Sequence, residues 1–147
     1  MQRRDFLKSS CNICLLGAAG FALPKLTGCS PALHSTGVYK TNIVGNKLEV
    51  PLALFDNTSL QIVRPTGWFY DIAVEKRADN TYGAILMRCT HQDNQLTAAG
   101  AGFTCSLHGS QFDKSGNVLK GPAEGRLQQY KATIINNNLL IEVPKTP

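Results

Sequence analysis

The chain has 147 residues, a length that suits one domain rather than two. Hydrophobic residues make up 43%, a normal globular fraction, and the 13 glycines and 7 prolines indicate many turns. The net charge is +5, but residues 1–28 supply +3 of it. A protein that binds nucleic acid needs a concentrated basic face, so nucleic acid is not expected as a partner.

The segment 1–28 has the layout of an export signal. Its basic start carries Arg3 and Arg4, and a moderately apolar stretch follows at 9–23. Paired arginines followed by Phe-Leu-Lys resemble the twin-arginine signal, although Gln2 stands where that signal usually has serine. We therefore expect a removable signal peptide and export across a bacterial inner membrane to the periplasmic side.

The sequence Leu-Thr-Gly before Cys29 resembles a bacterial lipobox, in which the chain is cut before the cysteine and the thiol is lipidated. A lipid anchor at Cys29 would leave residues 29–45, which are rich in turn-forming residues, as a tether. The alternative is an uncleaved anchor helix over 9–23. That stretch is short for a membrane span, which needs about 20 residues, and Pro24 would end the helix.

From residue 46 onward the pattern is that of a β domain. Apolar residues alternate with a period of two between residues 48 and 54. Short runs rich in isoleucine, valine and aromatic residues follow at 59–63, 68–74, 84–88, 130–135 and 139–143. Three asparagines at 136–138 tolerate positive φ and predict a hairpin. With no convincing helix after residue 23, we expect one all-β domain over residues 46–147, a small sandwich or barrel.

Two short motifs between these strands combine cysteine with histidine. Cys89 and His91 form C-x-H, and Cys105 and His108 form C-x₂-H. Two thiolates and two imidazoles in this arrangement match a [2Fe–2S] cluster in which two histidines replace two cysteines on one iron. The alternative is a tetrahedral zinc site, but zinc fingers usually pair cysteine with cysteine and histidine with histidine.

The segment from residue 89 to residue 123 closely resembles the Rieske protein family. It contains Cys-Ser-Leu-His-Gly-Ser-Gln-Phe-Asp at 105–113 and Gly-Pro-Ala at 121–123. The resemblance implies a small Rieske-type antiparallel β-sandwich or barrel, with a cluster-binding subdomain formed by two loops and one [2Fe–2S] cluster as cofactor. It also implies that the two cysteines hold the inner iron and that the two histidines hold the outer iron near the surface.

The resemblance gives four further residues a place beside the cluster. Gly109 fits a close backbone approach, and the family counterpart of Ser110 donates a hydrogen bond to a bridging sulfide. Pro122 lies where the family has a loop covering the cluster, with an ordinary turn as the alternative. Phe112 stands where the quinol-oxidising subunits have a tyrosine hydroxyl near a cluster thiolate.

Those subunits also join their cluster loops by a disulfide, which this chain cannot form. The matching positions are Asn94 and Leu107. The site thus combines a serine typical of high-potential members with the cysteine-free loops of ferredoxin-like members. We expect an intermediate reduction potential.

The resemblance implies an exported, membrane-anchored protein that carries single electrons between redox partners. The expected partners are a cytochrome or an oxidoreductase subunit, quinol being a further candidate, with the membrane contacted through a lipid at Cys29. One alternative is a Rieske subunit of a larger oxidoreductase of the quinol–cytochrome c or arsenite-oxidase-like kind. Another is a zinc-stabilised binding module. No nucleophile–base pair or nucleotide loop is visible in the sequence, so we do not expect an enzyme that acts alone.

Overall fold

The computed structural model describes residues 37–145. The predicted signal peptide, Cys29 and residues 30–36 of the predicted tether lie outside the described residues. Within residues 37–145, no helix combines the length and the apolar character that crossing a membrane requires.

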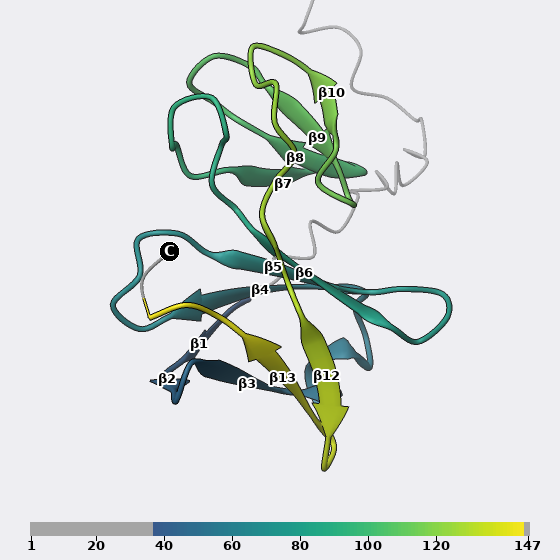
Figure 1. Ribbon diagram of the computed structural model, residues 1–147. Helices are drawn as coiled ribbons and strands as arrows, with labels where there is room; N and C mark the ends of the chain where they lie inside the picture. Colours follow the sequence, from purple (N-terminus) through teal and green to yellow (C-terminus); the bar gives the residue numbers. More distant parts are fainter. Residues whose placement is uncertain (1–36, 146–147) are drawn as a thin grey trace, which may run out of the picture. The chain divides into compact units, whose positions relative to one another are not determined.

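The described chain folds into three β-sheets (Figure 1). The five-stranded sheet has the order β1 (Val38–Thr41), β4 (Leu60–Pro65), β5 (Ile72–Lys76), β6 (Tyr82–Leu86) and β11 (Gln129–Tyr130). A four-stranded sheet contains β12 (Ala132–Ile135), β13 (Asn138–Glu142), β3 (Lys47–Pro51) and β2 (Ile43–Val44). The other contains β10 (Val118–Lys120), β9 (Gln111–Asp113), β8 (Gly102–Thr104) and β7 (Thr97–Ala99). This confirms the predicted all-β class, with one parallel pairing, between β1 and β4.

The β structure begins before residue 46, where the domain was predicted to start. Strand β1 pairs with β4, and β2 pairs with β3, so residues 38–44 belong to the sheets and not to a tether. Tyr39 and Ile43 from these strands pack against the apolar core. The sequence pattern does not reveal β1 and β2, because a strand of two to four residues is too short to show a period of two. The hydrogen bonds that pair these strands come from the backbone and leave no mark on residue type.

Two predicted strands end or begin elsewhere. The alternation through residue 54 stops as a strand at Pro51, and Leu52–Phe55 form a short 3₁₀ helix. Phe55 is still buried, and its ring packs edge-on against Tyr82 with 5.0 Å between centroids. The run predicted at 68–74 becomes a strand only from Ile72. Apolar character thus marks which residues face the core but not where each strand starts.

The predicted hairpin at 136–138 is confirmed. Strands β12 and β13 pair in register from Ala132 opposite Ile141 to Ile135 opposite Asn138. Asn136 and Asn137, which lie between them, have φ of 49° and 64°. Asparagine tolerates this left-handed conformation better than most residues do, which explains its use in the turn.

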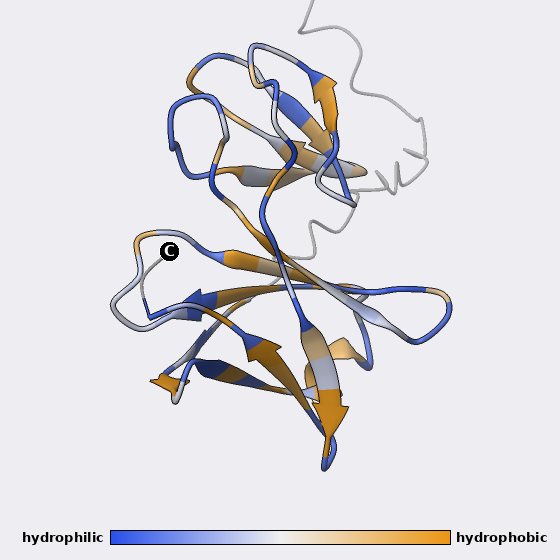
Figure 2. Cartoon of the chain, viewed as in Figure 1, coloured by the Kyte–Doolittle hydropathy of each residue, from blue (hydrophilic) through white to orange (hydrophobic). Residues whose placement is uncertain are grey.

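The described chain contains two groups of buried apolar residues. The first belongs to the five-stranded sheet and the β12–β13–β3–β2 sheet, together called the larger sheets below. It includes Leu48, Val63, Ile72, Leu139 and Ile141. Figure 2 shows apolar residues along β5 and β13. The second group combines residues of β5 and β6 with residues of the β10–β9–β8–β7 sheet and its loops. It includes Leu96, Phe103, Phe112, Leu127 and both motif cysteines. The two motif cysteines therefore lie in a different buried group from Leu48 and Ile141.

Candidate metal centre

Two loops carry the motifs. The first loop (residues 87–96) joins β6 to β7, and the second loop (residues 105–110) joins β8 to β9. The backbone closes the first loop where Leu96 N donates to Met87 O at 2.9 Å. Met87 N also donates to Asp71 O at 2.8 Å, which ties the start of the loop to the residue before β5. The antiparallel β8–β9 pair, with Thr104 opposite Gln111, fixes the ends of the second loop.

Both loops hold their cysteine by the same backbone pattern. In the first loop, Cys89 N donates to Asn94 O at 2.8 Å and Asp93 N donates to Cys89 O at 2.9 Å. In the second loop, Cys105 N donates to Ser110 O at 2.8 Å and Gly109 N donates to Cys105 O at 3.0 Å. Each cysteine therefore begins a closed turn of equal length, with both of its backbone polar groups bonded. These backbone hydrogen bonds therefore fix the position of each cysteine within its loop.

The structure brings the four predicted ligand residues together as two pairs. Cys89 and Cys105 are 1% and 2% exposed and belong to the same buried group. His91 and His108 are exposed, and their rings meet edge to face with 4.9 Å between centroids. The sulfur donors are thus buried, and the imidazole donors lie at the surface.

This pairing distinguishes between the two metal centres considered from the sequence. Across residues 37–145, no three side chains of histidine, cysteine, aspartate or glutamate converge closely enough to hold one metal ion. A tetrahedral zinc site needs four donors around a single point. A binuclear cluster of this ligand type needs two cysteines for one iron and two histidines for the other. The donor set therefore fits the cluster better than it fits zinc.

Hydrogen bonds favour the thiolate form of Cys105. Burial is the largest single influence and by itself would raise the pKa of this thiol, whereas backbone hydrogen bonds from Leu107 and His108 lower it. Further hydrogen bonds from Cys89 and from the Asn94 side chain act in the same direction, and the pKa lies below its ordinary value. The thiolate is the form that binds iron.

Asn94 is a site residue that the sequence did not predict. Its Nδ2 lies 3.6 Å from Cys105 Sγ, a contact that joins the first loop to the second. In the sequence Asn94 stood out only as a position that lacks a cysteine. The resemblance placed position 94 where the two loops meet, because quinol-oxidising subunits have a disulfide cysteine there. It did not indicate that the amide of Asn94 donates to Cys105, a contact that spans 11 residues.

Ser110 provides a second test of the fit. Its side chain is fully buried, and its Oγ accepts a hydrogen bond from Ala123 N at 3.1 Å. Within the described chain, no protein acceptor for its O–H is found. Burying a hydroxyl donor without a partner is unfavourable, so a sulfide acceptor beside it fits the site.

The Ser110 contact also locates the predicted proline loop. Ala123 directly follows Pro122, which is exposed, and the peptide bond between Gly121 and Pro122 is cis. The segment at 121–123 therefore contacts the second loop through this bond, and its role as a loop that covers a cluster stays a prediction.

Phe112 and Gly109 are the other two residues that were predicted to lie beside the cluster. Phe112 is 1% exposed and shares the buried group of the two cysteines, but its ring offers no hydrogen-bond donor. Gly109 has a φ of 78°, a conformation that favours glycine. No atom of the described chain lies within 4 Å of the position that a Cβ would take, so the positive φ is the reason that the structure shows for this glycine. Its close approach to a cluster stays a prediction.

Known proteins share both the sequence and the fold. The "Cytochrome b6-f complex iron-sulfur subunit" of Synechococcus elongatus is 43% identical over 79 residues, covering 52% of this chain and 43% of that protein. The subunit of the same description from Synechococcus sp. (strain JA-3-3Ab) is 28% identical over 149 residues, covering 95% of this chain and 86% of that protein. The chain thus spans less than half the length of the first of these relatives.

A solved structure supports the same conclusion. The cyanobacterial plasma membrane Rieske protein of Synechocystis PCC 6803 superposes with a TM-score of 0.50 at 26% identity, covering 58% of this chain and 87% of that one. The family model of the Rieske [2Fe-2S] domain matches residues 45–131, which include both motifs and the proline loop. The chain therefore belongs to the Rieske [2Fe–2S] domain family, whose cofactor is a [2Fe–2S] cluster.

Proposed function

We propose that this protein is an exported, membrane-anchored carrier of single electrons whose cluster is held by Cys89, Cys105, His91 and His108. The paired arrangement of these side chains carries the proposal: two buried sulfurs face inward, and two imidazoles 4.9 Å apart face solvent. When bound, the cluster supplies a one-electron couple with a potential above that of an all-cysteine cluster, because two neutral ligands replace two anionic ones.

The cysteine side and the histidine side of the site have different roles. The buried cysteine side excludes water and fixes the thiolates through the closed backbone turns. On the histidine side, the side chain of Leu107, which precedes His108, is 54% exposed. An apolar side chain beside two solvent-facing imidazoles gives a redox partner a surface on which to dock close to the outer iron.

A second candidate function is that of a subunit in a larger oxidoreductase. It is favoured by the relatives, whose names describe them as subunits of the cytochrome b6-f complex. By analogy, a cytochrome is the first partner to test, and quinol is the second. Affinity purification from native membranes in mild detergent distinguishes the two functions, because only the subunit will retain a large partner in a fixed ratio.

The ligand assignment predicts a specific cofactor content. The full chain purified from a bacterial host should contain two irons and two acid-labile sulfides per chain, and should give a Rieske-type EPR signal when reduced. Cys89→Ser and His91→Ala should each abolish that signal. Ser106→Ala, an exposed change in the second loop, should leave it intact. One zinc per chain without labile sulfide would instead establish the zinc-stabilised module.

Export and anchoring are proposed from the first 29 residues of the sequence. We expect the membrane fraction of a host with twin-arginine export to contain a chain that begins at an acylated Cys29, as identified by mass spectrometry. Cys29→Ala should release the chain or block its maturation, and Ser30→Ala should change neither. A membrane-bound chain with an intact Met1 would point to the uncleaved anchor.

A further inference from the structure

We propose that Asn94 sets the reduction potential of this protein by donating a hydrogen bond from its side-chain amide to Cys105 Sγ across the two loops. The inference rests on the proposed role of Cys105 as a ligand. It assigns to Asn94 a positioning and tuning role that the ligand residues themselves do not provide.

The hydrogen bonds of the amide fix its orientation. Asn94 Nδ2 lies 3.6 Å from Cys105 Sγ and 3.1 Å from Gln95 O. Both partners are acceptors, and an amide nitrogen carries two N–H donors while the amide oxygen carries none. Turning the amide over would place an oxygen against two acceptors. The nitrogen must therefore face the sulfur.

The backbone of Asn94 is fixed as firmly as its side chain. Its carbonyl oxygen accepts the hydrogen bond from Cys89 N at 2.8 Å. One residue thus contacts both cysteines, Cys89 through its backbone and Cys105 through its side chain. Asn94 cannot move relative to one sulfur-bearing residue without breaking a bond to the other.

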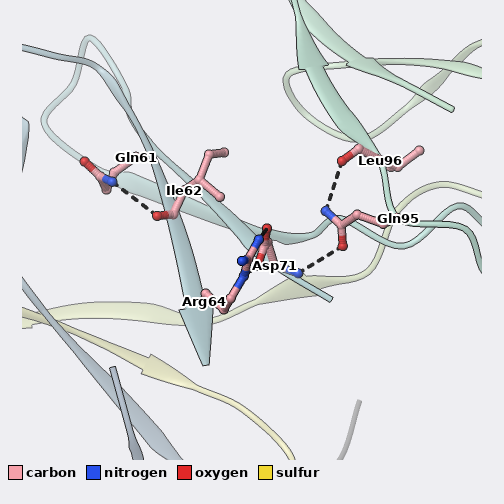
Figure 3. A network of polar contacts seen from close by, with 6 residues as sticks. All are labelled: Gln61, Ile62, Arg64, Asp71, Gln95 and Leu96. Carbon is pink, nitrogen blue, oxygen red and sulfur yellow. Dashed lines mark hydrogen bonds and ion pairs between the residues drawn. The ribbon is translucent and has the colours of Figure 1, made fainter. Parts of the chain in front are cut away.

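The carbonyl that orients the amide belongs to a residue tied to the large sheet. Gln95 Oε1 accepts a hydrogen bond from Asp71 N at 3.2 Å, and Gln95 Nε2 donates to Leu96 O at 2.9 Å. Arg64 in turn holds the Asp71 carboxylate by two bonds of 2.7 Å each. Figure 3 shows Gln95 between Asp71 and Leu96. The donor on the sulfur is therefore supported from the five-stranded sheet.

The sign of the effect follows from charge. Reduction adds negative charge to the cluster and its thiolate sulfurs. An N–H donor aimed at one of these sulfurs stabilises the reduced form more than the oxidised form, so the potential rises. The bond lies beside a sulfur that is 2% exposed, where solvent does little to screen it. Phe112 offers no such donor. Backbone N–H groups of Leu107 and His108 also donate to this sulfur, and Asn94 adds a side-chain N–H from the other loop.

The test compares reduction potentials by protein-film voltammetry on the purified full chain. Asn94→Leu removes both N–H donors at similar volume. It should favour the oxidised form about fivefold, which lowers a one-electron potential by roughly 40 mV at about 59 mV per tenfold. Gln92→Leu makes the same chemical change at an exposed neighbouring position in the first loop and should leave the potential unchanged. Asn94→Ala serves as a second variant should the leucine prevent folding.

The outcomes separate this inference from the proposed function. An intact Rieske-type EPR signal with a lowered potential in the Asn94 variants alone supports the inference. An intact signal with an unchanged potential overturns the role of Asn94 and leaves the ligand assignment standing. An equal shift in Gln92→Leu also overturns it, because the effect would then follow loop polarity. A wild-type chain without labile sulfide overturns the proposed function itself.

Discussion

At the scale of single residues, the sequence predicted what the motif spacing carries and missed what only the fold brings together. The four proposed ligands and Ser110 lie in two short segments whose spacing is unusual enough to be read directly. For Gly109 the structure shows a φ of 78°, which favours glycine, and its close approach to a cluster stays a prediction. Asn94 was missed because its partner lies 11 residues away in the other loop.

Ser110 should raise the reduction potential in the same way as Asn94. Its buried O–H has no protein acceptor among the described residues and points to a cluster sulfide as its partner. If that bond strengthens by about 1 kcal/mol on reduction, Ser110→Ala should lower a one-electron potential by roughly 40 mV. Voltammetry beside Ser106→Ala, an exposed serine in the same loop, measures the difference. Matching potentials in the two variants would mean that the Ser110 hydroxyl does not reach the sulfides.

At the scale of elements, runs of apolar residues predicted most strands of the larger sheets. They did not predict where each strand begins or ends, because that depends on backbone hydrogen bonds. The strand from Lys47 stops at Pro51, since proline has no N–H with which to continue the ladder. No strand was predicted for the short strands of the cluster-bearing sheet, β7 to β10, because three residues show no clear period. Their pairing had to come from the structure.

The β8–β9 pair has no room for a side chain at Gly102. A Cβ at this position would collide with the carbonyl oxygen of Phe112 on the neighbouring strand, and backbone atoms cannot swing aside as a side chain can. We therefore expect Gly102→Ala to destabilise the folded chain by about 1–3 kcal/mol and to lower cluster occupancy, because this pair fixes the ends of the second loop. Thermal unfolding and iron content would be measured together.

Gly125→Ala is the matched control for Gly102→Ala. It makes the same substitution in the same part of the chain, but the new Cβ would have only an ordinary contact with Thr90, at 3.8 Å. Its unfolding temperature and iron content should match those of the unaltered protein. Equal losses in the two variants would show that the β8–β9 approach is not what makes Gly102 necessary.

At the scale of the whole described chain, the two buried groups differ in what stabilises them. The group in the five-stranded sheet and the β12–β13–β3–β2 sheet is made of apolar residues and contains neither motif cysteine. The group around the motifs contains both cysteines and is built on short strands and loops. It is joined to the larger sheets by polar contacts such as the Lys114–Glu75 ion pair at 2.8 Å. Cofactor binding should therefore stabilise the group around the motifs more than the group in the larger sheets.

Removal of the cluster should loosen the loops and spare the larger sheets. Ligands that bind only the folded site add their binding free energy to the stability of that site. Without the cluster, the backbone amides of Cys89, Cys105 and Gly109, now hydrogen-bonded within the loops, should exchange with solvent at least about tenfold faster, which is about 1.4 kcal/mol of local opening. Amides of Val50 and Ile141, which pair β3 with β13, should change far less.

Hydrogen–deuterium exchange by mass spectrometry measures both groups of amides in one experiment. The chain with its cluster is compared with Cys105→Ser, which cannot retain it under the proposed ligation, and with Ser106→Ala as the matched control that can. Faster exchange confined to residues 87–96 and 105–110 in Cys105→Ser would support local stabilisation by the cluster. Faster exchange across β3 and β13 as well would contradict it, because the larger sheets would then depend on the cluster despite a core built without the cysteines.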